Sequence, residues 1–155
     1  MQLVEGNLWD ALGRAHLLQV STNATVASAG HLVMGRGAAR EAKLRFPSLD
    51  RELGSLLRRH RMAGSLYGIL LATSQWHPYT RLGALQTRRH WYHDADPWLI
   101  RYSVRRLREL IDAGPEGQLV AMNYPGIGNG HLREEVVAPI LAELPDNVLV
   151  YRRPR

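Results

Sequence analysis

The stretch GQLVAMNYPGIGNGHL at residues 117–132 places three glycines at alternate positions between an apolar run and a helical pattern. The apolar run Leu119–Met122 predicts a buried strand, and the helical pattern begins at Glu134. The glycines are Gly126, Gly128 and Gly130. Glycine permits positive φ and close approach of another body, at a cost in folding entropy. The loop is therefore either a tight connection or the seat of a bound ligand.

A second loop of the same kind occurs earlier, at residues 33–39 (VMGRGAA). It opens a predicted helix at residues 37–46, and it follows Thr22 and Asn23 at the end of an earlier predicted strand. Successive backbone N–H groups at a glycine turn, backed by a helix N-terminus, form an anion site. Two such loops at strand ends could hold a diphosphate from both sides.

Strands and helices alternate along most of the chain. We expect strands at residues 2–5, 16–22, 66–72, 83–87, 119–122 and 147–151, and helices at 37–46, 49–59, 97–113 and 134–144. Asp96 and Pro97 are typical of a helix start, with a capping Asp followed by Pro at the first helical position. The stretch 66–72 is typical of a fully buried strand, and we expect it to pair with 83–87. In the last helix the inward residues are expected to be Val136, Val137, Ile140 and Leu141. The alternation predicts one α/β domain over residues 1–155, a three-layer α/β/α sandwich with ligands at the carboxyl ends of its strands.

Composition restricts the class of protein. The 155 residues are 45% apolar, carry a net charge of +6 and include no cysteine, so disulfides and thiolate chemistry are excluded. No apolar run is long enough to cross a membrane and the first residues do not form a signal peptide, so a cytoplasmic location without membrane contact is expected. The positive charge favours an anionic partner. Because Lys43 is the only lysine among 20 basic residues, genome composition is an equal explanation for the arginines.

Five segments together carry a resemblance to a known family. They are EGNLW (5–9), STNATV (21–26), VMGRGAA (33–39), LQTRRHW (85–91) and NYPGIGNGHL (123–132). In this order they resemble the macrodomain, and within it the branch of the terminal ADP-ribose protein glycohydrolases and the DNA ADP-ribosyl glycohydrolase antitoxins. The resemblance covers nearly the whole chain. It implies an α/β/α sandwich with a mixed central sheet that binds ADP-ribose in a cleft at the strand ends.

The resemblance also implies which residues meet the ligand. The implied set is Asn7, Leu8, Asn23, Val33, Met34, Gly35, Arg36, Gly37, Ala38, Gly126, Ile127, Gly128, Asn129 and Gly130. The two loops would hold the diphosphate, and Asn23 would meet the hydroxyls of the distal ribose, although a strand-end Asn often only closes an Asx turn. Asn7 stands where the family usually has an Asp that accepts the adenine amino group, and Leu8 would form the adenine wall.

The catalytic pattern of the branch is altered in this chain. Arg88 stands where the branch has a lysine thought to attack the distal ribose, and arginine cannot form that Schiff base. The Asp that usually follows the glycine loop is also displaced, or replaced by Glu134. A non-covalent route would use Arg88 to bind a leaving carboxylate, His131 or Glu134 to position water, and Gln86 to orient a hydroxyl or that water. Three of these residues also have a purely structural interpretation. Arg88 could be a solvated arginine at a strand end, Glu134 could favour the positive end of its helix, and His131 could only cover the loop.

The sequence therefore predicts a monomeric ADP-ribosylhydrolase that releases mono-ADP-ribose from Glu or Asp esters of modified proteins, without a metal or other cofactor. Two alternatives stay open: a reader of ADP-ribose without turnover, and a hydrolase acting on ADP-ribosylated DNA. His90, His93 and Asp94 have the spacing of metal ligands, but a packed turn is favoured. The arginine stripe of residues 101, 105 and 108 is interpreted as a solvated helix face, with a nucleic-acid surface as the alternative.

Overall fold

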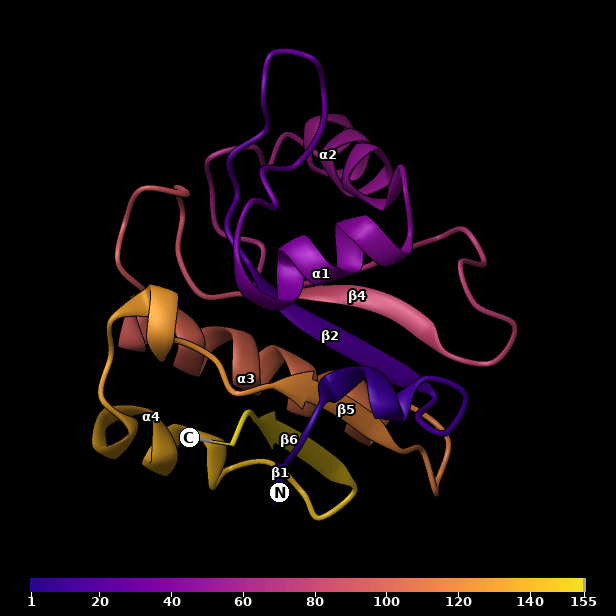
Figure 1. The fold of residues 1–155 in the computed structure, drawn as a ribbon, viewed down its shortest axis with the longest axis vertical. Helices are drawn as coiled ribbons and strands as arrows, with labels where there is room; N and C mark the ends of the chain where they lie inside the picture. The colour runs from indigo at the N-terminus through magenta and orange to yellow at the C-terminus, as the bar shows by residue number, and fades with distance from the viewer. Residues whose placement is uncertain (155) are drawn as a thin grey trace.

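The centre of the fold is a six-stranded sheet with the strand order β1-β6-β5-β2-β4-β3, seen in a computed structural model that describes residues 1–154 (Figure 1). The strands are β1 (Gln2–Glu5), β2 (Leu17–Thr22), β3 (Ile69–Leu71), β4 (Arg81–Gln86), β5 (Val120–Asn123) and β6 (Val148–Arg152). Neighbouring strands are parallel except for β3, which is antiparallel to β4. The predicted mixed central sheet is therefore confirmed.

Helices cover both faces of this sheet. They are α1 (Gly37–Arg45), α2 (Leu49–Arg59), α3 (Pro97–Ala113) and α4 (Glu134–Leu141), with two 3₁₀ turns, η1 (Leu8–Ala11) and η2 (Gly128–Gly130). Successive residues of β2 point to opposite faces: Leu18 packs in a core with α1 and α2, whereas Leu17 packs in a second core with α3 and α4. Two cores on the two sides of one sheet confirm the predicted three-layer α/β/α sandwich.

The helix signals in the sequence place the helices well. The side chain of Asp96 accepts a hydrogen bond from the amide of Trp98 (2.9 Å), and Pro97 occupies the first turn of α3, as predicted. The four leucines of α2 at positions 49, 53, 56 and 57 are buried. Gly54 in the same helix lies against the chain at residues 30–32, where an added Cβ would come within 2.2 Å of the carbonyl oxygen of Gly30. This close contact holds α2 against the segment that leads into the first glycine loop.

Two expectations for these elements were wrong. The stretch 66–72 does not form a fully buried strand: β3 has only three residues, half-buried, because it lies at the edge of the sheet and is paired on one side only. In α4, Val136 is 40% exposed whereas Val137, Ile140 and Leu141 are buried, and the helix ends at Leu141 instead of residue 144. Burial in β3 and at Val136 depends on where these residues lie relative to distant strands. A local sequence pattern does not contain that information.

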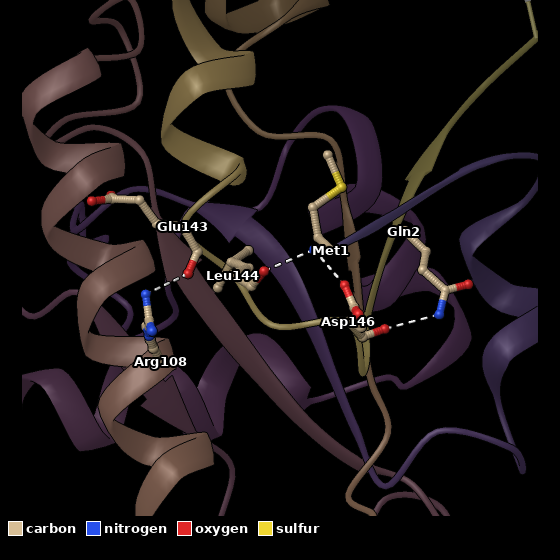
Figure 2. Close-up of polar contacts among 6 residues, drawn as sticks. All are labelled: Met1, Gln2, Arg108, Glu143, Leu144 and Asp146. Carbon is tan, nitrogen blue, oxygen red and sulfur yellow. Dashed lines mark hydrogen bonds and ion pairs between the residues drawn. The ribbon is translucent and has the colours of Figure 1, made fainter.

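Polar contacts connect the first residues of the chain to the segment between α4 and β6 (Figure 2). The N-terminal ammonium group of Met1 donates to the carbonyl of Leu144 (2.7 Å), and the side chain of Gln2 donates to the carbonyl of Asp146 (2.9 Å). Arg108 of α3 donates to the carbonyl of Glu143 (2.8 Å). These contacts fix β1 beside β6 and α3 beside the end of α4.

Because β1, β2, β4, β5 and β6 are mutually parallel, their carboxyl ends lie at one edge of the sheet. Five segments leave the sheet at that edge, beginning at Gly6, Asn23, Thr87, Tyr124 and Arg153. The candidate site lies there. Among the helices described, none has both the length and the apolar content needed to span a membrane.

Candidate functional site

The two glycine loops face each other across a narrow gap at the carboxyl edge of the sheet. A Cβ added to Gly37 would lie 3.5 Å from the side-chain nitrogen of Asn129, so the start of α1 and the turn η2 are in near contact. Both loops line a small cavity of about 70 Å³. Segments about 90 positions apart in the sequence therefore form the two walls of one cleft.

Both walls present backbone N–H groups that have no acceptor within residues 1–154. These are the amides of residues 35–38 and 126–129. Arg36 and Ile127 hold the N-cap positions of α1 and η2, and neither makes a side-chain capping bond. Gly37, Gly126 and Gly128 have φ of +60°, +82° and +65°, a region that glycine enters without strain. Unpaired donors on both sides of one gap form a site for an anion.

The first loop is held in place by Asn23. Its side-chain nitrogen donates to the carbonyl of Val33 (3.0 Å) and its side-chain oxygen accepts from the amide of Thr25 (2.8 Å), which closes an Asx turn. The hydroxyl of Tyr67 donates to the carbonyl of Asn23 (2.7 Å), and burial raises the pKa of this tyrosine, so it stays a neutral donor. Asn23 also lines the neighbouring cavity, so the structural and the ligand-binding interpretations apply to the same side chain.

A second cavity of about 340 Å³ opens on one side of the gap. Leu8, Gly6 and Tyr151 line it together with residues of both glycine loops. Leu8 therefore lines the groove, and its role as an adenine wall stays a prediction. Asn7 does not line this cavity, because its side-chain oxygen turns toward η1 and accepts from the amide of Trp9 (3.0 Å).

A third cavity of about 400 Å³ opens on the other side of the gap. Its lining includes Asn23, Val33, Arg36, Arg88 and Trp91. The small cavity shares Gly37, Ala38, Tyr124, Asn123, Ile127 and Asn129 with the second cavity, and Ser21, Arg36 and Arg88 with the third. The three cavities therefore form one elongated groove with the amide-lined gap at its middle.

Arg88 lies between the gap and the third cavity. Its Nη1 donates to the carbonyl of His93 (2.8 Å) and to the carbonyl of Asn129 (3.4 Å), so it connects the 89–95 loop to the second glycine loop. Its Nε is buried without a partner within residues 1–154. Burial, followed by the nearby positive charge of Arg36, lowers the pKa of Arg88, and Asp94 acts in the opposite direction.

Gln86 does not reach the groove, although it was expected to orient a ribose hydroxyl or a water. Its side chain is fully buried, with the oxygen accepting from the amides of Tyr67 (2.7 Å) and Gly68 (3.0 Å). Its nitrogen donates to the carbonyls of Ser65 (2.8 Å) and Arg88 (3.3 Å). All its hydrogen-bonding capacity is used inside the fold, so Gln86 connects the end of β4 to residues 65–68 and to the backbone of Arg88.

Glu134 also lies away from the position expected for a base that activates water. Its carboxylate accepts from Nη1 of Arg152 at the end of β6, and the other terminal nitrogen of Arg152 pairs with Glu5. Arg152 lines the cavity of about 340 Å³, whereas Glu134 lines none of the three cavities. The expectation that Glu134 supplies the missing carboxylate near Arg88 is corrected accordingly.

The acidic residue beside Arg88 is Asp94, which the sequence suggested only for its spacing from His90 and His93. Its carboxylate lies 2.7 Å from Nδ1 of His131, and both side chains are largely exposed. His131 itself adopts a left-handed backbone conformation with φ of 63° directly after η2. The pair joins the 89–95 loop to the second glycine loop. Two further contacts make the same connection: the hydrogen bonds of Arg88, and the amide of Ala95, which donates to the carbonyl of Gly130 (3.0 Å).

The 89–95 loop forms the aromatic rim of the third cavity. His90 and Tyr92 stack with ring centroids 5.3 Å apart, and His93 meets both rings edge-on. Trp91 is 51% exposed and lines the cavity. This is the packed turn favoured from the sequence, and within residues 1–154 no three His, Cys, Asp or Glu side chains are grouped as metal ligands.

The arginine stripe of α3 is partly neutralised. Arg105 pairs with Glu143 (3.4 Å) and Arg106 with Glu109 (3.0 Å), while Arg108 donates to a carbonyl at the end of α4. Arg105 and Arg106 remain more than half exposed in these pairs, as a solvated helix face requires.

Neither a protein-family model nor a curated protein matches the chain, but solved structures do. The structure of Thermosipho africanus DarTG in complex with ADP-ribose is 25% identical, with a TM-score of 0.72 over 98% of this chain and 41% of that one. The chain thus spans about two fifths of that protein. The macrodomains of Thermus aquaticus DarG (20% identical, TM-score 0.70) and Mycobacterium tuberculosis DarG (21%, 0.68) are each covered to 97% by 99% of this chain. These similarities extend over the whole α/β/α sandwich.

Proposed function

We propose that this chain, which has the macrodomain fold and resembles the macrodomains of DarG, binds ADP-ribose in the groove at the carboxyl edge of its sheet. The observation that supports this most directly is the pair of facing walls with unpaired amides at residues 35–38 and 126–129. A hydrogen bond from an amide to a charged acceptor contributes about 1.5–3 kcal/mol. Four or five such bonds hold a diphosphate without a metal ion or a lysine.

The three cavities provide space for the three parts of this ligand. The diphosphate occupies the gap between the loops, and the adenosine extends into the cavity that Leu8 lines. The distal ribose then enters the cavity beside Asn23 and Arg88. The amide-lined gap at the middle of the groove supports the placement of the diphosphate, and the DarTG structure, which was solved with ADP-ribose bound, supports the choice of ligand.

The binding proposal is tested by titration calorimetry with ADP-ribose. Gly128→Glu places a carboxylate in the gap and should abolish the heat of binding. Gly117→Glu is the matched control, because Gly117 also has positive φ (+77°) and open space around it but lies in the turn before β5. The proposal uses no metal, so EDTA should leave the titration unchanged. Equal affinities in the two variants would refute the placement of the diphosphate.

We further infer that the site hydrolyses mono-ADP-ribose from carboxylate esters of modified proteins. In that reaction water attacks the distal C1″, the bond from C1″ to the ester oxygen breaks, and the acid departs as a carboxylate while the proton of the water passes to solvent. A carboxylate leaves without being protonated, so it needs a positive charge more than a general acid. Arg88 provides this charge beside the distal cavity, where no Asp or Glu contributes to the lining.

Release of free ADP-ribose from an automodified transferase tests the hydrolase proposal. Arg88→Ala should lower the rate at least about tenfold, because a charge-assisted bond to the leaving group is lost. Arg89→Ala is the control, since Arg89 is exposed and lines none of the cavities. Binding of ADP-ribose without any release at stoichiometric protein would instead establish a reader module.

One observation favours a second candidate, hydrolysis of ADP-ribose from DNA bases. The exposed ring of Trp91 lines the distal cavity, and the exposed ring of Tyr92 meets it edge-on. Such rings stack with unpaired bases of single-stranded nucleic acid. Comparing a modified oligonucleotide with a modified protein as substrate separates the two candidates, and faster release from the oligonucleotide would favour the second.

A further inference from the structure

The central sheet divides at its carboxyl edge, between the neighbouring strands β2 and β5 in the middle of the strand order (Figure 1). These two strands pair over three residues each, and the last pair is Gln19 with Met122. Beyond that pair, β2 stays with β4 as far as Thr22, and β5 stays with β6 as far as Asn123. The two halves of the sheet therefore separate over the last residues of β2 and β5.

The side chain of Asn123 spans this division. Its Oδ1 accepts from the backbone amide of Ser21 (2.8 Å), and its Nδ2 donates to the hydroxyl oxygen of Ser21 (2.9 Å). The same Nδ2 donates to the carbonyl of Tyr124 (3.3 Å). A backbone N–H of β2 that would pair with β5 in a continuous ladder is thus satisfied by a side chain. Asn123 connects the two halves of the sheet at a separation that backbone pairing does not set.

Ser21 and Asn123 form the floor of the gap between the glycine loops. They are the residues of β2 and β5 that line the small cavity of about 70 Å³, whereas the loops line its walls. The hydroxyl oxygen of Ser21 accepts the bond from Asn123, but the hydroxyl proton has no acceptor within residues 1–154. A serine hydroxyl donates one bond while it accepts others. Its proton can therefore point into the gap.

The direction of this hydroxyl depends on Asn123. A backbone N–H can only donate, so the atom of the Asn123 amide that faces the amide of Ser21 must be the oxygen. The amide nitrogen is then the atom that faces the Ser21 hydroxyl, and it can only donate. Asn123 therefore cannot take up the hydroxyl proton, which stays available for a ligand.

We propose that the Ser21 hydroxyl donates a hydrogen bond to the diphosphate from the floor of the gap, and that Asn123 is the positioning residue for this donor. Asn123 orients the hydroxyl and connects the two strands that carry the gap. The proposal rests on the function proposed above, because ADP-ribose binding places the diphosphate between the loops. It adds one donor from the sheet to the amides of the two loops. Adenosine, which lacks phosphates, gains nothing from this hydroxyl.

Titration calorimetry of the intact chain with ADP-ribose and with adenosine tests the contact. Ser21→Ala should weaken the binding of ADP-ribose at least about tenfold, because a hydrogen bond to a charged acceptor is lost. Ser21→Thr keeps the hydroxyl and should retain the affinity. Adenosine should bind the Ser21→Ala chain as it binds the unmodified chain, because Ser21 does not line the cavity of about 340 Å³. An unchanged affinity for ADP-ribose in Ser21→Ala, or equal losses for both ligands, would overturn the contact.

A double-variant cycle tests the positioning role. Asn123→Ala should weaken the binding of ADP-ribose at least as much as Ser21→Ala, since the hydroxyl loses its orientation and the two strands lose their connection. In the Asn123→Ala background, Ser21→Ala should then cost only about threefold or less, because the hydroxyl no longer points to the ligand. The full tenfold loss in both backgrounds would overturn the role of Asn123.

Asn147→Ala is the matched control for this cycle. The Asn147 side chain donates to the carbonyl of Gln118 and so connects the segments before β6 and β5, at the opposite end of the sheet. Asn147 lines none of the three cavities of the groove, so this variant should retain the affinity for ADP-ribose. If the unmodified chain does not bind ADP-ribose, the proposed function has failed first. If it binds and the Ser21 and Asn123 variants bind equally well, only the present inference has failed.

Discussion

At the scale of single residues, the groove depends on side chains whose partners come from distant segments. The resemblance found in the sequence implies a lysine at the position of Arg88, and burial together with the charge of Arg36 lowers the pKa of this arginine. A guanidinium stays protonated in spite of that, because its ordinary pKa is far above neutral. An amine in the same surroundings would lose its proton much more readily.

We therefore expect Arg88→Lys to form the covalent adduct that the unmodified chain cannot form. Burial and the charge of Arg36 should lower the pKa of the new amine below its usual value of about 10.4, so the neutral nucleophile is available at moderate pH. Incubation with ADP-ribose and cyanoborohydride, followed by mass spectrometry of the intact protein, measures the trapped adduct. The yield of the adduct should rise as the pH passes through the lowered pKa of the new amine, because only the neutral amine attacks.

The unmodified chain is the control for this experiment, and it should show no adduct at position 88 at any pH. An adduct on Lys43 in the unmodified chain would contradict the non-covalent route. An Arg88→Lys chain that binds ADP-ribose but forms no adduct would show that position 88 does not reach C1″.

The sequence identified the two loops that line the groove, but not the direction of each side chain. Glycine spacing identified both loops, because backbone conformation at glycine is a local property. Gln86 and Glu134 were assigned to the chemistry, yet their partners are Tyr67 and Arg152, which no local pattern connects to them. Asp94 was missed as the acidic neighbour of Arg88 because it belongs to a different loop from the one that usually carries the carboxylate.

At the scale of elements, two buried glutamines on neighbouring strands have opposite environments. Gln86, at the end of β4, makes four hydrogen bonds. Gln19, in the middle of β2, is equally buried, but neither its side-chain oxygen nor its nitrogen has a partner within residues 1–154. Its amide lies over Gly83 of β4, where a Cβ would come within 2.3 Å of it. A buried amide without partners lowers the stability of the fold.

We expect Gln19→Met to raise the free energy of unfolding by about 1 kcal/mol, since it removes unpaired polar atoms while keeping the side-chain length. Gln86→Met should lower it by at least about 2 kcal/mol, because two buried amides lose their acceptor. Urea unfolding followed by circular dichroism measures both changes. A loss of stability in Gln19→Met would contradict the interpretation that the Gln19 amide is unsatisfied in the folded protein.

The elements that were predicted well are those whose signals are local. The cap and proline at Asp96 and Pro97 fixed the start of α3, and α2 has the predicted bounds. The short edge strand β3 was overestimated because its antiparallel pairing with β4, and its lack of a partner on the other side, depend on contacts across the sheet. Val136 was predicted to point inward because it is apolar. The sequence does not show which side of α4 faces the sheet, and Val136 is exposed.

At the scale of the whole molecule, the groove exists only when distant parts of the chain are assembled. One amide-lined wall lies at the start of α1, and the other lies after β5, about 90 positions later in the sequence. The unfolded chain has no such pair of walls. A ligand that binds between them therefore stabilises the folded state by mass action.

ADP-ribose at about 100 times its dissociation constant should stabilise the fold by about 2.7 kcal/mol. For a chain of this size that corresponds to a rise in melting temperature of roughly 5–10 °C, measurable by differential scanning calorimetry. Adenosine at the same concentration should give a much smaller rise, because it lacks the diphosphate. An equal rise in Gly128→Glu would contradict binding between the loops.

The uncapped starts of α1 and η2 have a practical consequence for any solution in which the protein is handled. A cleft with unpaired donors on both walls is not selective among small oxyanions, so sulfate or phosphate in a buffer occupies it first. Weak apparent affinities in such buffers would then measure displacement of these ions. Purification and assay in chloride or a bulky zwitterionic buffer should restore the full affinity, with a difference that grows in proportion to the concentration of the competing salt.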